Sequence, residues 1–146
     1  MAANDAADRR VEFETKVAIL VLADLAVWQK LNVTAFLATG IAGAAPEAMG
    51  APYLDSAGRT HAALLGQPIM IFAADASALQ RAWRVANERG LTRAAYVRTM
   101  FETGHDAANR AAFAAEPAAA PDLVGLALRG PRRDVDKAVK GCRLHG

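Results

Sequence analysis

Short apolar runs alternate along this chain with longer segments whose apolar residues recur at helical spacing. The run at 16–22, KVAILVL, is continuous and rich in branched side chains, which is typical of a strand buried on both faces. A helical segment follows from Leu25 to about Ile41, and glycine and proline residues close it. Its apolar positions are Leu25, Trp28, Leu31, Ala35 and Ala38. This alternation predicts a layered α/β fold.

The rest of the chain repeats the alternation. Turn-forming residues in YLDSAGRTH, 53–61, predict a hairpin or tight loop. Asp75 or Ser77 can cap the second helix, and Gly90 can end it. The further predicted elements are a strand in 68–74, a helix at 78–89, a strand at 93–97, a helix at about 107–116, a linker at 117–121 and a strand at 123–128.

The stretch GPRRDVDKAVKG, 130–141, reads as a turn, a short helix and a stop. Asp136 and Lys137 are adjacent on this helix, so their side chains diverge by about 100° and do not face each other as an i,i+4 pair would. One interpretation is a helix cap beside a solvated lysine. The alternative is that Lys137 contacts a phosphate or carboxylate.

Composition limits the class of protein. The 146 residues fit one α/β domain at 15–146 after a flexible tail at 1–14. With 17 basic and 15 acidic residues, charge alone does not mark a nucleic-acid binder. The first ten residues lack the apolar core of a secretory signal, and no apolar run approaches the roughly 20 residues that span a bilayer. We expect a cytoplasmic protein with no membrane partner.

A family resemblance follows from the order of these elements and a few short motifs. Asp24-Leu25 after the first strand, Gly130-Pro131, and Asp136-Lys137 near the end resemble type II peptidyl-tRNA hydrolases, over most of 16–144. NVTAFLATG, MFETGHDAANRAAF and LRGPRRDVDKAVKG together resemble the bacterial family called domain of unknown function 2000. The resemblance implies a three-layer α/β/α sandwich with a mixed four-stranded sheet, and a strand-like tail beside that sheet.

The catalytic groups of the hydrolases are only partly present. Their lysine, glutamine and histidine positions on the first helix hold Asn32, Phe36 and Thr39 here. The aspartate of their second signature falls on Thr99, and only the final threonine survives, as Thr103. A lysine supplies a fixed cation for an oxyanion or a phosphate, whereas asparagine supplies a neutral donor. These changes weigh against the parent reaction.

The stretch TGHDAAN, 103–109, gathers a hydroxyl, an imidazole, a carboxylate and an amide. In one interpretation Asp106 caps the helix that starts at 107 and His105 is merely exposed. In the other, the imidazole acts as general base, because histidine titrates near neutral pH. A shared sheet edge would bring this loop to the start of the first helix. The candidate catalytic residues are Asp24, Thr103 and His105, and the candidate ligand-binding residues are Asn32, Asp106, Asn109 and Lys137.

Three functions remain open, and the sequence leaves undecided whether the chain is an enzyme. The first is a small-ligand-binding or interaction protein, expected as a homodimer, which keeps the hydrolase fold without its chemistry. The second is a hydrolase of an ester or amide with a rebuilt site. The third is an RNA-binding protein, which needs a basic patch from Arg81, Arg84, Arg89, Arg129, Arg132, Arg133 and Lys137. We expect no cofactor, and no metal-ligand spacing occurs.

Overall fold

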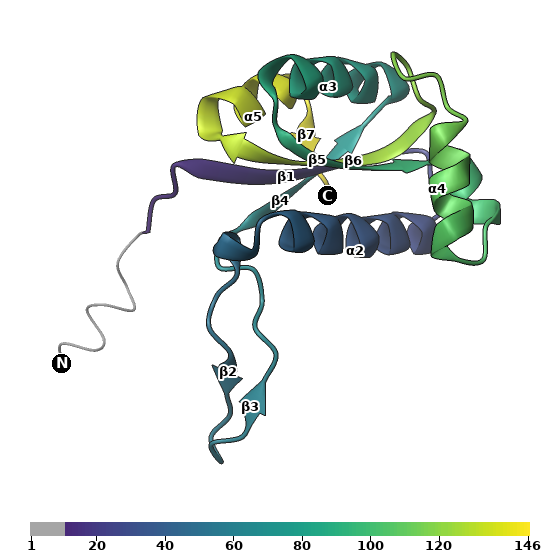
Figure 1. The fold of residues 1–146 in the computed structure, drawn as a ribbon. Coiled ribbons are helices and arrows are strands. Elements are labelled where there is room, and N and C mark those ends of the chain that lie inside the picture. The colour runs from purple at the N-terminus through teal and green to yellow at the C-terminus, as the bar shows by residue number, and fades with distance from the viewer. Residues whose placement is uncertain (1–10) are drawn as a thin grey trace.

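Five strands form one mixed sheet in the computed structural model, which describes residues 11–146 (Figure 1). In spatial order they are β5 (Thr92–Val97), β6 (Leu123–Pro131), β1 (Thr15–Leu22), β4 (Ile69–Ala74) and β7 (Arg143–Leu144). β1 runs parallel to β4, and the other neighbours are antiparallel. The sheet has five strands rather than the expected four, because the C-terminal tail pairs with β4. Residues 1–10 of the predicted tail lie outside the described residues.

Helices cover both faces of this sheet, which gives the predicted three layers (Figure 1). One face carries α2 (Val27–Ala44), and the other carries α3 (Ala76–Arg89) and α5 (Arg132–Ala138). The short helix α4 (Asp106–Ala114) lies beside one end of the sheet and follows the 3-10 helix η2 (Arg98–Glu102). Among residues 11–146, no helix combines the length and apolarity needed to span a bilayer.

The centre of the core is β1, flanked by β4 and β6. Its residues 17–21 are almost entirely inaccessible to solvent, as are Leu126 and Leu128 of β6. Because helices cover both faces, neither face of β1 needs polar side chains, and the strand is a continuous apolar run. The predicted strand at 16–22 is therefore confirmed.

Local signals correctly marked the ends of α3 and the C-terminal turn. The Ala78 N–H donates to Asp75 Oδ1 at 2.8 Å, and Gly90 closes the helix at a φ of 63°. Gly141 ends the turn after α5 with a φ of 85°. The cap interpretation of Asp136 is wrong: this residue lies within α5, and its carboxylate accepts from Lys16 Nζ at 2.6 Å.

The helix α2 buries a different face from the one predicted. Val33, Leu37 and Ile41 face the sheet, whereas Trp28 is 62% exposed and Leu31 is 67% exposed. The prediction failed because α2 is apolar around most of its circumference, so two apolar stripes compete. Periodicity cannot tell which of two such stripes meets the sheet.

Two glycines let α2 approach the sheet closely. A Cβ built on Gly40 of α2 would lie 2.8 Å from the Ala94 Cβ of β5. A Cβ on Gly125 of β6 would lie 2.9 Å from Leu37 Cδ1. Neither spacing is tolerated between carbon atoms, so a side chain at either position would push the helix outward.

A β-hairpin projects from the body on the side of α2 (Figure 1). We call residues 51–64 the arm; its strands are β2 (Tyr53–Leu54) and β3 (Thr60–His61). The predicted hairpin is confirmed. Hydrogen bonds close its base, where Gly50 N–H donates to Leu64 O at 2.8 Å and Gly66 N–H donates to Ala48 O at 2.7 Å.

The tip of the arm is organised by one carboxylate. Asp55 Oδ1 accepts from the backbone N–H groups of Ala57 and Arg59. Its Oδ2 lies 2.9 Å from His61 Nε2 and 2.8 Å from Arg59 Nε. The hydrogen bond with His61, followed by those from Arg59 and Ala57, lowers the pKa of Asp55 from 3.8 to about 2.

The lowered pKa predicts the pH at which protonation of Asp55 weakens the hydrogen bonds of the arm tip. Because the folded pKa lies below the ordinary value, the contribution of ionised Asp55 to the stability of the arm tip is complete above about pH 4. It is lost as the pH falls toward 2. NMR signals of the Ala57 and Arg59 amides should therefore shift with a midpoint near pH 2, and Asp55→Asn should remove the transition. A midpoint near pH 4 would contradict the strength of these bonds.

The close packing of α2 gives a matched pair of stability predictions. Gly43 lies three residues from Gly40 on the same helix, and a Cβ there meets nothing within 4 Å. Gly43→Ala should raise the free energy of unfolding by about 0.5–1 kcal/mol, because alanine favours helix. Gly40→Ala should instead lower it by about 1–2 kcal/mol, because Ala94 must move. Urea unfolding followed by circular dichroism measures both, and equal effects would refute close packing at Gly40.

Candidate functional site

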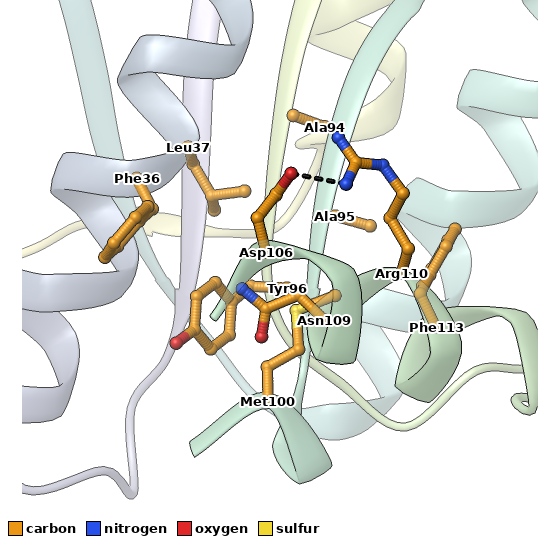
Figure 2. Close-up of a pocket in the computed structure, with 10 residues that line it drawn as sticks. All are labelled: Phe36, Leu37, Ala94, Ala95, Tyr96, Met100, Asp106, Asn109, Arg110 and Phe113. Atoms are coloured by element: carbon orange, nitrogen blue, oxygen red, sulfur yellow. Dashed lines mark ion pairs between the residues drawn. The ribbon is translucent and has the colours of Figure 1, made fainter. Parts of the chain in front are cut away.

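A groove lies between α2 and α4, over the end of β5. Its main hollow has a volume of about 330 Å³ and is bounded by residues from α2, β5, η2 and the start of α4. A second hollow of about 230 Å³ adjoins it and shares Phe36, Tyr96, Met100, Asp106 and Asn109 (Figure 2). Figure 2 shows Phe36 on the α2 side of this second hollow and Phe113 on the α4 side.

One wall of the groove is a chain of aromatic rings, which we call the aromatic wall: Trp28, Phe101, Tyr96 and Phe36. Successive ring centroids lie 5.9, 5.3 and 6.3 Å apart in tilted or edge contacts, the geometries that aromatic pairs favour. Tyr96 is buried, and this burial raises the pKa of its phenol. Trp28 and Phe36 are more than half exposed and leave ring surface free.

Sequence reasoning missed this wall. Trp28 was considered as one apolar position of the helical pattern, and Phe36 only as the residue at a catalytic glutamine position. The available signal was the number of large apolar residues on α2, which exceeds what one face against the sheet can bury. The excess on the second stripe marks a surface that meets something other than the sheet.

The main hollow is also lined by polar groups, one on α2 between the aromatic rings and the others from the stretch 103–109. It carries five residues that the sequence put forward as candidates, and we call them the polar wall: Asn32, Thr103, His105, Asp106 and Asn109. The structure therefore brings the start of α2 and the stretch 103–109 to one hollow. Asn32 is exposed, and its side chain has no hydrogen-bond partner among residues 11–146.

His105, not Asp106, caps α4. The Ala108 N–H donates to His105 Nδ1 at 3.2 Å, and Asp106 is the first residue of the helix. The predicted Asp106 cap is wrong because the extended backbone of His105 folds its ring over the first turn. With Nδ1 accepting, the hydrogen of the neutral ring sits on Nε2, so that nitrogen is a donor.

Two side-chain contacts hold the loop around His105. The Thr103 hydroxyl donates to Met100 O at 2.8 Å and also contacts the Asn109 amide, which ties the end of η2 to α4. Asp106 forms an ion pair with Arg110 one turn along α4 (Figure 2). Both partners are largely exposed, so the pair adds little stability, but it balances the charge at the groove.

Two candidate residues lie elsewhere. Asp24 is exposed in the turn after β1 and does not line the groove. Lys137 belongs to α5, on the other face of the sheet (Figure 1). β1 and β5, which end at Leu22 and Val97, finish at the same end of the sheet but are not neighbours, because β6 lies between them. This intervening strand separates the turn that holds Asp24 from the loop at 103–109.

Part of the basic patch expected for RNA binding is engaged within the protein. Arg89 contacts Asp134 at 3.4 Å, and Arg129 contacts Glu47 at 3.3 Å. The Arg132 guanidinium donates to a backbone carbonyl, Phe13 O, at 2.9 Å. The two ion pairs neutralise arginine charges, and the third contact engages a guanidinium, so these three side chains are less available to RNA phosphates.

Comparison with known proteins places the chain among relatives of unknown function. A solved structure of a protein of unknown function from Agrobacterium tumefaciens strain C58 is 47% identical and superposes with a TM-score of 0.88, covering 92% of this chain and 100% of that one. No curated protein matches the chain. The family model described as "Protein of unknown function (DUF2000)" matches residues 15–146. Since this match spans nearly the whole chain, the protein belongs to the DUF2000 family.

Proposed function

We propose that the protein binds a small, flat, uncharged polar molecule in the groove between α2 and α4. The observation that carries this proposal is the pairing of two walls. Exposed ring surface on Trp28 and Phe36 lines the same hollow as hydrogen-bonding groups of Asn32 and His105 that the protein leaves free, and Asn32 lies between the two rings, one helical turn from each. Ligand sites commonly combine a mostly apolar lining with a few polar groups that fix orientation.

The chemistry of the two walls limits the class of ligand. The aromatic wall suits a planar ring, since stacked or edge contacts with aromatic side chains need a flat partner. The Asn32 amide and the His105 Nε2–H suit acceptors at the edge of such a ring, such as a carbonyl oxygen or a ring nitrogen. Asp106 is balanced by Arg110, so a polyphosphate would find no excess of positive charge. Nucleobases and nucleosides combine a planar ring, hydrogen-bond acceptors at its edge and no phosphate charge.

The geometry favours binding over hydrolysis. A general base needs a ring nitrogen with a free lone pair. In neutral His105 the Nδ1 lone pair accepts from the helix, and Nε2 carries the hydrogen. Asp24, the carboxylate retained from the hydrolase pattern, does not line the groove. The rebuilt-hydrolase alternative therefore lacks both a base and its orienting acid at this position.

The ligand class can be tested by thermal unfolding with a panel of free nucleobases and nucleosides. A neutral ring compound at about a hundred times its Kd should raise the Tm by about 5–10 °C. Asn32→Ala should reduce that rise, whereas Thr39→Ala, an exposed change on the same helix outside the groove, should not. Nucleoside triphosphates should bind no more tightly than the neutral compounds. A panel in which no neutral compound raises the Tm would contradict the proposal.

The two roles assigned to His105 can be separated by two substitutions. His105→Ala removes the cap of α4 and should lower the free energy of unfolding by about 1 kcal/mol. His105→Asn keeps a capping acceptor and should stay near the stability of the parent. Both lose the Nε2–H, so both should weaken the ligand response. Urea unfolding and the ligand-induced rise in Tm give the two readouts. Full ligand response in His105→Asn would exclude the imidazole from binding.

A further inference from the structure

Two apolar surfaces remain uncovered in a single copy of the chain. The outer face of α2 carries Val27, Trp28, Leu31 and Phe36. The arm carries Tyr53, Leu54 and Leu64. Each of these side chains is more than half exposed. Large apolar side chains gathered in this way mark surfaces that meet a partner.

The arm gains little stability from its own chain. All four residues of β2 and β3 are exposed, and an isolated two-stranded hairpin is marginal in water. The hydrogen bonds at Gly50 and Gly66 fix its base and direct it away from the body (Figure 1). The arm therefore extends beyond the helix of its own chain, and its apolar side chains are available to another molecule.

The arm and the outer face of α2 are comparable in length and similar in chemistry. The 18 residues of α2 span about 27 Å at 1.5 Å each. The arm, measured along its shorter strand from Leu64 to the tip at Gly58, spans about 20 Å at 3.3 Å each, so it can lie along about three quarters of α2. Lys30 is the one ionisable residue on α2, and interface centres are poor in charge and rich in aromatic residues.

We infer that two copies form a symmetric homodimer in which the arm of each protomer lies along the outer face of α2 of its partner. A twofold axis makes the same contact twice, so both arms and both outer faces of α2 are covered in the dimer. The seven side chains offer on the order of 700 Å² per copy, near the roughly 800 Å² per partner of a standard interface. Trp28 and Phe36 also line the groove, so the partner's arm would border it, but dimer formation itself requires no ligand.

The test is oligomeric state by light scattering and sedimentation at increasing protein concentration. Leu54→Lys changes the arm and Leu31→Glu changes the helix; both residues are exposed, so both variants should fold, as circular dichroism can verify. Glu88→Lys, an exposed change on α3 across the sheet, is the control. The parent and the control should be dimers. Each of the other two variants should dissociate, with a Kd raised at least about tenfold.

Mixing the two dissociated variants tests the assigned pairing. In a mixed dimer one arm and one helix are unchanged and meet, while the other contact brings the introduced lysine of one variant toward the introduced glutamate of the other. The mixture should therefore dimerise more tightly than either variant alone. A parent chain that stays monomeric at millimolar concentration overturns the inference. So does a dimer that neither substitution weakens, or one that Glu88→Lys weakens equally.

Discussion

The close contact between α2 and the sheet is the constraint on which the rest of the structure depends. At Gly40 and Gly125 the helix and strands approach with no room for a side chain. Val33, Leu37 and Ile41 can then fill the space between the layers, and they are the buried residues of α2. Its remaining apolar side chains are left for the groove and for the outer surface. This one contact thus sets which stripe of α2 is structural and which is available for recognition.

In the proposed site, groups of the loop at 103–109 that stabilise the structure are also the groups offered to a ligand. His105 stabilises the first turn of α4 through Nδ1, and this bond decides which ring nitrogen carries the hydrogen that faces a ligand. Thr103 and Asn109 contact each other, so the polar wall is partly organised before any ligand arrives. A site arranged in this way loses less conformational entropy on binding. The same arrangement removes the lone pair that proton abstraction would require.

Much of the fold could be predicted from the sequence because its signals are local. Branched apolar runs gave the strands, Asp75 and Gly90 gave the ends of α3, and turn residues gave the hairpin. The stretch at 103–109 was placed against the start of the first helix, where the structure has it. Three features could not be predicted: the buried face of α2, the cap of α4 and the position of Asp24. The buried face of α2 and the position of Asp24 depend on how elements pack and on which strand lies between two others, which no short stretch encodes. The cap of α4 is local, but adjacent His105 and Asp106 can both cap a helix, and the sequence does not decide between them.

The base of the arm has a separate consequence for how the protein tolerates change. Gly50 and Gly66 sit close together, with Met49 and Leu65 paired beside them, so the chain leaves the body and returns at nearly the same point. The base of the arm alone therefore connects α2 to β4, whatever the length of the arm. Residues beyond this base can lengthen, shorten or be exchanged without altering the register of β1 and β4, since a loop with adjacent ends adds little closure entropy per residue. The arm is a module that can diverge between relatives while the sheet and the groove stay the same.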